Sequence, residues 1–385
     1  MTRKICVVVT ARPSYSRIKT ALRAIVDHPK LELQLVVSAS ALLDRFGAAV
    51  DVMERDGFTA CAKVFNVIEG ENLVAAPKTT ALGILELATV FLNIRPDIVV
   101  TIADRFETMA TAVAAAYMNI PLAHVQGGEV TGNIDEKVRH AVTKLADYHF
   151  VASESARERV LRLGERPDSI FNTGCPSIDL ARAVASDNDA MPFDPYVKYG
   201  GVGEVLDLSA GYLIVLQHPV TTEQGQARQQ AEATLEAVSS LGLPTLWFWP
   251  NLDAGGDATS GAIRAFREIR KPPLIHFFKN MEPEDFLRLL VGATCLVGNS
   301  SVGIRECSFL GVPVVNIGSR QALRDRGRNV LDVAHDAASV RAGVEHWMHA
   351  TRPAPETIYG GGDAGERIAD LLATVPLRFH KTIAY

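Results

Sequence analysis

The stretch 293-ATCLVGNSSVGIRECSFLGVPVVNIG-318 decides the fold class of this chain. It begins with a short apolar run, continues through a turn of small polar residues and a helical segment, and ends in a second apolar run. Short apolar runs bounded by turn residues are typical of buried strands. A strand, a helix and another strand in succession predict two parallel strands joined by a crossover helix.

Similar apolar runs recur along the rest of the chain and alternate with segments of helical spacing. One such segment, 15-YSRIKTALRAIVDH-28, places Ile18, Leu22 and Ile25 on one helical face. The alternation predicts an α/β protein with doubly wound parallel sheets. The expected strands are KICVVVT, LELQLVV, DIVVTIA, PLAHV, YHFVA, GYLIVLQ, PTLWFW, LIHFF, TCLVG and VPVVNIG.

The length of the chain predicts two domains, because 385 residues exceed what one hydrophobic core usually supports. The periodicity lapses at 184–204 into Asp, Asn, Pro and Gly, the composition of a connecting segment. We therefore expect an N-terminal domain at 1–183, a linker at 184–204 and a C-terminal domain at 205–365. A C-terminal helix and tail at 366–385 would be able to pack back on the N-terminal domain.

The composition is that of a soluble globular enzyme. A net charge of -5 provides no global positive field for nucleic acid or an anionic membrane. Five scattered cysteines without a C-x-x-C pair indicate reduced thiols, so we expect a cytoplasmic protein without disulfides or a metal site. The longest apolar segment, 80–94, contains Glu86 and is shorter than the roughly 20 residues that span a membrane. We expect no transmembrane segment and no redox cofactor.

The turn inside 293–318 has the features of a phosphate cradle. Gly298 permits a tight turn, and the hydroxyl groups of Ser300 and Ser301 add donors to the free N–H groups of a helix start. Glu306, further along that helix, is placed to accept from ribose hydroxyls. An ordinary serine-capped helix explains the same residues and remains the alternative.

A second polar cluster follows the apolar run that ends at Val125, in 124-HVQGGEVTGNIDEKVRHAVTKLADYH-149. Ligands of doubly wound sheets bind beyond the carboxyl ends of the strands. Acidic and basic side chains at such a place suit proton transfer on a sugar. The cluster comprises Gln126, Glu129, Asp135, Glu136, Arg139 and His140.

Polar side chains follow other predicted strands as well. Asp104 and Arg105 place an acid or base beside a cation directly after DIVVTIA, and an exposed ion pair is the alternative. The remaining candidates are Arg12 and Ser16 after the first strand, His218 after GYLIVLQ and Asn251 after PTLWFW, for which a surface arginine, a structural histidine and a polar turn are the alternatives.

Taken in order, these segments resemble the hydrolysing UDP-N-acetylglucosamine 2-epimerases, especially the branch that supplies sialic-acid-type and legionaminic-acid-type sugars. The resemblance extends over nearly the full length. It rests on ARPSYS, DRFE at 104–107, GGEVTGNIDEKVRHAVTKLADYH, GCPSID at 174–179, QHPVTT, PNLDAG, GNSSVGIRE and NIGSRQ at 316–321.

The resemblance implies a GT-B fold, in which two Rossmann-like domains face a cleft that holds a nucleotide sugar. It also implies a reaction on a UDP-linked 2-acetamido sugar. UDP is eliminated while a base removes the C2 proton, and water then adds to give a free, mannosamine-type 2-epimer. This chemistry requires no cofactor and no metal, and relatives are commonly homodimers or homotetramers.

By the same resemblance, the candidate residues divide into two groups. Those for catalysis are Asp104, Arg105, Gln126, Glu129, Asp135 and His218, with Asp104, Gln126, Asp135 and Asp179 on the sugar side. Those for the nucleotide side are Arg12, Ser16, His218, Asn251, Ser300, Ser301, Glu306 and Arg320.

The chain departs from the family pattern on the sugar side. The family usually has His-Gly-Asp where this chain has Ile102-Ala103-Asp104, and Glu-Gly-Gly-Glu where this chain begins with Gln126. A neutral amide cannot accept a proton near neutral pH. Either other carboxylates carry the proton transfers, or the sugar differs, or the nucleotide sugar is cleaved without epimerisation. A GT-B glycosyltransferase and a non-catalytic nucleotide-sugar binder are the further alternatives.

Overall fold

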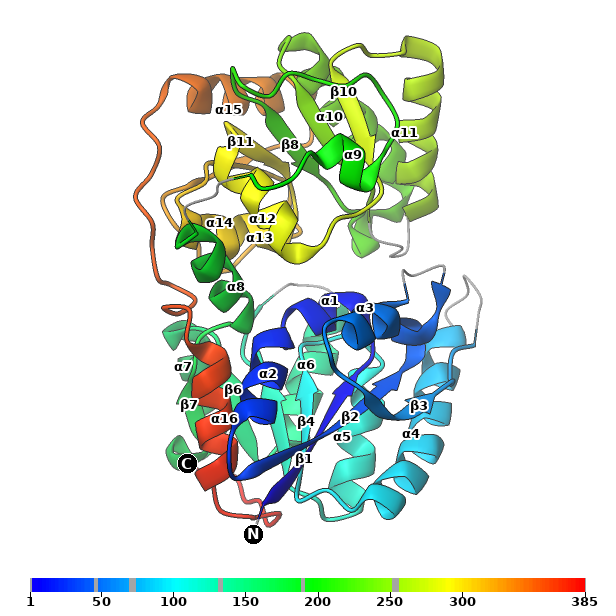
Figure 1. Cartoon of the computed structure of the whole chain (residues 1–385), viewed down its shortest axis with the longest axis vertical. Coiled ribbons are helices and arrows are strands. Elements are labelled where there is room, and N and C mark those ends of the chain that lie inside the picture. Colours follow the sequence, from blue (N-terminus) through cyan, green and yellow to red (C-terminus); the bar gives the residue numbers. More distant parts are fainter. Residues whose placement is uncertain are drawn as a thin grey trace. The chain divides into compact units, whose positions relative to one another are not determined.

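The computed structural model describes residues 2–44, 48–68, 74–130, 134–187, 191–250 and 256–384. The chain forms two compact units, drawn in Figure 1. The first consists of Met1–Asp179 together with Tyr359–Tyr385, and the second of Leu180–Ile358. The chain therefore returns to its first unit at the C-terminal end.

The first unit is built on a sheet of seven parallel strands in the order β3-β2-β1-β4-β5-β6-β7. The order reverses between β1 and β4, which are paired in parallel. Such a reversal makes a topological switch point at the carboxyl ends of the strands. The strands are β1 (Arg3–Val9), β2 (Leu31–Ser38), β3 (Ala60–Val64), β4 (Ile98–Ile102), β5 (Leu122–Val125), β6 (Tyr148–Val151) and β7 (Ile170–Asn172).

Helices cover both faces of this sheet, because alternate strand residues are apolar on both sides. In β1, Ile5 and Val7 enter one core with α2 and α16, and Cys6 and Val8 enter the other with α4 and α5. The helices are α1 (Arg12–Ser16), α2 (Lys19–Asp27), α3 (Ala49–Arg55), α4 (Ala75–Ile94), α5 (Thr108–Tyr117), α6 (Ile134–Leu145), α7 (Glu154–Arg162), α8 (Pro176–Ala185) and α16 (Ala364–Thr374), with 3-10 turns η1 (Ala39–Leu42) and η3 (Pro167–Ser169).

The second unit has six parallel strands in the order β10-β9-β8-β11-β12-β13, with its switch point between β8 and β11. The quoted stretch 293–318 forms β11, α13, α14 and β12, so the predicted parallel unit is confirmed. The elements are β8 (Leu213–Leu216), β9 (Thr245–Phe248), β10 (Ile275–Phe278), β11 (Cys295–Gly298), β12 (Val314–Ile317), β13 (Val330–Val333), α9 (Pro195–Tyr199), α10 (Ala227–Ser240), α11 (Gly256–Arg270), α12 (Pro283–Gly292), α13 (Ser301–Ile304), α14 (Glu306–Leu310), α15 (Ala337–His349) and η4 (Thr221–Gln226).

The segment at 191–204 is ordered by contacts within the second unit. Asp194 caps α9 by accepting from the Tyr196 backbone N–H at 2.7 Å. Further on, Val202 forms an antiparallel bridge with Phe277 of β10. These contacts attach this part of the expected connection to one edge of the second sheet.

Helix α4 is longer than the apolar segment expected from the sequence. Within the described ranges it is the single helix that is long and apolar enough to cross a membrane. Core helices of soluble proteins often meet the same two criteria. Leu87 and Phe91 are buried in the core beneath it. Leu85 and Leu92 of this helix are exposed.

A buried carboxylate fixes the C-terminal tail to the first unit. Glu165 accepts from Lys144 and Lys381 at 2.6 Å each and contacts His149 Nε2 at 3.1 Å. Burial raises the pKa of Glu165, but the hydrogen bonds from these three side chains lower it to about 2. The tail is thus held by an ionic network as well as by the packing of α16 on α2.

We predict that Glu165→Gln makes the fold less stable and removes part of its acid sensitivity. The pKa of Glu165 lies below its ordinary value of 4.5, so its contribution is complete above about pH 4.5 and is lost as the pH falls toward 2. The variant should lose on the order of 3 kcal/mol at pH 7. Urea unfolding followed by circular dichroism at a series of pH values measures both effects.

Glu154→Gln is the matched control, because Glu154 forms an exposed ion pair with Arg157. It should change the free energy of unfolding by less than about 0.5 kcal/mol. The assignment is wrong if Glu165→Gln keeps the wild-type dependence on pH.

Candidate active site

Two neighbouring strands of the first sheet end in left-handed, non-glycine residues. Ala103 follows β4 with φ 64°, and Gln126 follows β5 with φ 67°. Each such conformation costs on the order of 1–3 kcal/mol and persists where surrounding contacts enforce it. Here the Ala103 N–H donates to Val125 O at 3.0 Å and the Gln126 N–H to Phe150 O at 2.8 Å. Backbone strain of this kind is concentrated at functional sites.

A buried histidine supports the first of these turns. His124 Nε2 lies 2.8 Å from Ala103 O, and its Nδ1 lies 3.1 Å from Thr143 Oγ1. Burial lowers the pKa of His124 to about 3, so the ring is neutral near pH 7. Because a carbonyl oxygen only accepts, the ring proton belongs on Nε2. His124 therefore fixes the backbone immediately before Asp104.

One buried guanidinium contacts the chain that follows β4 and the chain that follows β5. Arg139 of α6 is 1% exposed; it forms an ion pair with Asp104 and donates from Nη1 to Glu129 O at 2.7 Å. Burial lowers the pKa of Arg139, but the charges of Asp104, Glu129 and Asp135 raise it above its ordinary value. Asp104 and the Glu129 backbone thus both contact Arg139, a residue that is absent from the predicted catalytic set, and the catalytic roles of Asp104, Glu129 and Asp135 stay predictions.

Gln126 contacts a thiol. Its side chain is 2% exposed, and Nε2 donates to Cys175 Sγ at 2.8 Å. Cys175 Sγ in turn lies 3.0 Å from Ser177 Oγ at the start of α8. The Gln126 Oε1 atom is buried and has no hydrogen-bond partner among the described residues. Such an oxygen is costly unless a ligand or water supplies a donor.

The turn after Gln126 requires glycine. Gly128 has φ 77°, and a Cβ atom there would lie 2.3 Å from Ala156 O of α7. The chain therefore passes too close to α7 for any side chain. This close approach to α7 fixes the position of the backbone immediately before Glu129.

Two other first-unit candidates are held by local contacts. Arg105 Nε lies 3.3 Å from Glu107 Oε2, and the Ser16 hydroxyl donates to Pro13 O at 3.0 Å inside α1. Arg12 is the first residue of α1. Their predicted ligand contacts remain predictions.

Asp179 belongs to α8, and its side chain lies against the first residues of α16. Its carboxylate accepts from the Ala364 and Gly365 backbone N–H groups at 2.9 and 2.8 Å, and from Thr20 Oγ1 at 2.7 Å. Burial raises the pKa of Asp179 above its ordinary value, and these hydrogen bonds only partly offset the rise. The structure thus shows Asp179 as a helix cap that joins α8, α2 and α16, and its role on the sugar side stays a prediction.

In the second unit, Asn299 organises the strand ends. It follows Gly298, whose Cβ would lie 2.2 Å from Leu216 O, so glycine is required. The fully buried Asn299 side chain accepts from the His218 N–H at 2.7 Å and donates to His218 O at 2.8 Å. Its own carbonyl accepts from Arg320 Nη1 at 3.1 Å. Asn299 therefore joins His218 to Arg320, a link that only the folded chain reveals.

The predicted phosphate cradle has the features of a capped helix. Ser300 Oγ accepts from the Val302 N–H at 3.4 Å, and Ser301 Oγ accepts from Arg305 Nη2 at 2.9 Å. Glu306 Oε2 is buried without a hydrogen-bond partner in the described part of the chain. The serine-capped helix is present, and binding of a phosphate at this turn stays a prediction. Asn251 lies outside the described residues.

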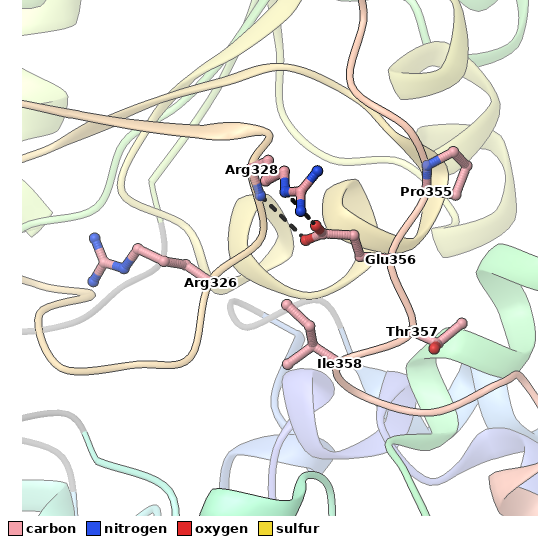
Figure 2. Close-up of a pocket in the computed structure, with 6 residues that line it drawn as sticks. All are labelled: Arg326, Arg328, Pro355, Glu356, Thr357 and Ile358. Atoms are coloured by element: carbon pink, nitrogen blue, oxygen red, sulfur yellow. Dashed lines mark hydrogen bonds and ion pairs between the residues drawn. The ribbon is translucent and has the colours of Figure 1, made fainter.

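A surface pocket of the second unit lies apart from these candidates. Figure 2 shows Arg328 and Glu356 facing each other across it, with the Arg328 N–H donating to Glu356 Oε2 at 3.1 Å, while Arg326 points away. Arg326 pairs with Asp332. The pocket contains none of the predicted site residues. Among the residues that the structure describes, no group of three or more His, Cys, Asp and Glu side chains is arranged to hold a metal ion.

Comparison with known proteins agrees with the resemblance. A family model described as UDP-N-acetylglucosamine 2-epimerase matches residues 23–373. The UDP-N,N'-diacetylbacillosamine 2-epimerase (hydrolyzing) of Legionella pneumophila is 31% identical over 98% of this chain and 97% of its own. The UDP-N-acetylglucosamine 2-epimerase of Neisseria meningitidis is 29% identical over 97% of this chain and 95% of its own.

Solved structures show the same fold. The N. meningitidis UDP-GlcNAc 2-epimerase bound to UDP-GlcNAc has a TM-score of 0.79 at 16% identity and covers 96% of this chain and 99% of its own. The S. aureus MnaA–UDP structure has a TM-score of 0.77 at 18% identity, with 96% of both chains covered. The predicted GT-B fold, with two Rossmann-like parallel sheets, is confirmed.

We predict that the His124 ring stays neutral, with its proton on Nε2, from pH 8 down to about pH 4. Burial holds its pKa at about 3, so the unfolded chain binds the proton more readily and stability falls as the pH drops from 6.5 toward 3. Nitrogen-15 NMR of the histidine rings measures charge and tautomer directly. A His124 ring that titrates near 6.5, as an exposed histidine does, would contradict the assignment.

Proposed function

The chain belongs to the UDP-N-acetylglucosamine 2-epimerase family, and we propose that it converts a UDP-linked 2-acetamido sugar into UDP and a free sugar inverted at C2. Two relatives, which cover 98% and 86% of the chain, are named as hydrolysing 2-epimerases of UDP- or GDP/UDP-linked N,N'-diacetylbacillosamine. The observation that carries the proposal is the buried Arg139, which forms an ion pair with Asp104, donates to the Glu129 carbonyl and lies on the same helix as Asp135, beside the strand ends of the first unit.

The proposed reaction has two steps. A carboxylate removes the C2 proton, the C2–H electron pair forms a C1=C2 double bond, and the C1–O bond breaks so that UDP leaves with its electron pair. Water then adds its oxygen at C1, while an acid returns a proton to C2 on the other face. Two faces require two proton-transfer groups, each worth roughly 10²- to 10⁴-fold. Asp104, Glu129 and Asp135 supply enough carboxylates for this task.

Arg139 keeps these carboxylates in place in the proposed mechanism. Its two contacts, to Asp104 and to the Glu129 carbonyl, fix residues from different turns relative to each other. A group that transfers a proton must lie within hydrogen-bond reach of the reacting atom, so small displacements reduce the rate strongly. Arg139 is therefore a positioning residue in this proposal.

We assign the nucleotide to the second unit. The Asn299 network holds His218 and Arg320 beside the turn that carries Ser300 and Ser301. Hydroxyl groups, backbone N–H groups and arginine suit the charge that develops on the leaving diphosphate. The buried Oε2 of Glu306 has no donor among the described residues, and a ribose hydroxyl would supply one. Arg12 and Asn251 keep their predicted roles in this proposal.

Gln126 directs the substrate in this proposal, although it transfers no proton. Its Nε2 donates one hydrogen bond to Cys175, and its Oε1 acceptor has no partner within the described part of the chain. An N–H or O–H group of the sugar would complete that oxygen. The same residue favours a second candidate function, a nucleotide-sugar hydrolase that releases the sugar without inversion, because the amide replaces a carboxylate of the family pattern.

One incubation distinguishes the two functions. The protein is supplied with UDP-N-acetylglucosamine or UDP-N,N'-diacetylbacillosamine in D₂O, and the products are followed by proton NMR. We expect UDP and a free sugar that is inverted and deuterated at C2. Asp104→Asn should reduce turnover by at least about 10²-fold. A free sugar of unchanged configuration without deuterium would contradict epimerisation and establish simple hydrolysis.

We predict that Gln126→Glu lowers kcat on the true substrate by about 10-fold or more. A carboxylate cannot donate to Cys175 Sγ, and burial of its charge close to that sulfur is unfavourable. Cys175→Ser is the matched control: a hydroxyl accepts the same amide hydrogen bond, so kcat should stay within about threefold. A Gln126→Glu variant that is faster than the wild type would show the amide to be a defect.

A further inference from the structure

The C-terminal tail, residues 375–384, is attached to the edge of the first sheet where the strands begin (Figure 1). Arg3, the first residue of β1, donates from Nη1 to Val375 O at 2.6 Å. Further along the tail, the side chain of Lys381 is 22% exposed, so its ammonium group is largely withdrawn from water. The tail thus brings a cation to the edge of the sheet that lies opposite the candidate active site.

The ammonium group of Lys381 caps the C-terminal end of α6. Its Nζ donates to Thr143 O at 3.1 Å and to Ala146 O, and it lies 2.6 Å from Glu165 Oε2. An ammonium group has three donors, so these three acceptors use all of them. The last carbonyl groups of a helix lack intrahelical donors, and a cation beside them also interacts favourably with the helix dipole. Lys381 therefore fixes the position of the end of α6.

Thr143, which Lys381 contacts, also supports the turn after β4. Its hydroxyl lies 3.1 Å from His124 Nδ1, and the other ring nitrogen of His124 lies 2.8 Å from Ala103 O. Ala103 directly precedes Asp104, which forms an ion pair with Arg139, one turn before Thr143 in α6. The position of the His124 ring, and with it the turn before Asp104, therefore depends on the last turn of α6.

The last turn of α6 is held to the tail by a shared carboxylate as well. Lys144 of α6 donates to Leu163 O at 3.1 Å and to Glu165 Oε1 at 2.6 Å, while Lys381 binds the other oxygen of Glu165. The Glu165 side chain is 2% exposed, and hydrogen bonds to a charged group are strengthened where water is excluded. The helix and the tail are thus joined through one buried group, so they are held in a fixed relative position.

We propose that Lys381 is a positioning residue for the reaction: by capping α6 it holds Thr143 against His124, and thereby holds the turn that carries Asp104. Lys381 acts from the far edge of the sheet and touches no reacting atom. The inference rests on the proposed function, because it concerns the rate of that reaction. A displacement of about 1 Å at a proton-transfer group is able to reduce the rate by about 10²-fold, so a change at the end of α6 should reach the chemistry.

The first test measures UDP release by Lys381→Met, which keeps an unbranched side chain and removes the ammonium group. We expect kcat to fall by about 10-fold or more, with KM within about threefold of the wild type, because the nucleotide contacts are assigned to the second unit. Arg378→Met is the matched control: it removes a cation of the same tail that pairs with exposed Asp168, and kcat should stay within about twofold. Circular dichroism at the assay temperature verifies that both variants are folded. A Lys381→Met variant with the wild-type kcat overturns the proposal.

The second test is a double-mutant cycle between Lys381 and Thr143. Thr143→Val removes the hydroxyl that contacts His124 at nearly constant volume, and it should also lower kcat. Because both changes act on the same contact, the double variant should be within about threefold of the slower single variant. If the two reductions in kcat multiply, Lys381 acts by another route and the proposal is wrong.

The third test needs no substrate, so it separates a failure of this inference from a failure of the proposed function. Nitrogen-15 NMR of the His124 ring reports the hydrogen bond that Nδ1 accepts from Thr143. In Lys381→Met the Nδ1 resonance should move toward its position in Thr143→Val, whereas in Arg378→Met it should keep its wild-type position. An unchanged resonance in Lys381→Met overturns the inference. If the resonance moves but the wild type turns over neither nucleotide sugar, the link from Lys381 to His124 stands and the proposed reaction is wrong.

Discussion

The ion pair between buried Arg139 and Asp104 is the constraint on which the first-unit site depends. A guanidinium out of contact with water is costly unless its charge and its donors are satisfied. Arg139 meets this requirement only if the turn after β4 delivers Asp104 and the turn after β5 delivers the Glu129 carbonyl. The position of α6 relative to two strand ends is thereby fixed by electrostatics, and Asp135 lies on the same helix.

The same requirement explains why the two turns are strained. If the backbone stayed extended after the strand, the chain would continue in the strand direction, and the residues that follow would lie beyond the end of the sheet. Left-handed residues at Ala103 and Gln126 reverse the chain instead, immediately before Asp104 and before the two glycines that lead to Glu129. Neutral His124 stabilises the first reversal through the Ala103 carbonyl. The strained conformations persist because the ion pair of Arg139 with Asp104 and the hydrogen bond of His124 to Ala103 O both form in this geometry.

Much of the fold was predictable from local pattern, and the failures share a cause. All ten expected strands are present, whereas β3, β7 and β13 were not expected, and each lies at the edge of its sheet. Edge strands are covered less completely, so they lack the continuous apolar runs that mark buried parallel strands. The carboxylates Asp104, Glu129 and Asp135 were predictable because they follow strands. Arg139 belongs to the predicted polar cluster, but its ion pair with Asp104, like the contacts of His124 and Asn299, joins segments far apart in the chain, which no spacing rule reveals.

Gln126 shows that a side chain at this turn can change while the backbone geometry of the turn is kept. Its backbone makes the left-handed turn and the hydrogen bond to Phe150 whatever its side chain is, so the frame does not depend on a carboxylate there. The side chain is free to vary as long as the buried volume is filled and its donor is satisfied, which Cys175 achieves. In the proposed mechanism, substitution at this position therefore alters what would be offered to a sugar, an acceptor in place of a base, while Arg139 and Asp104 stay where they are.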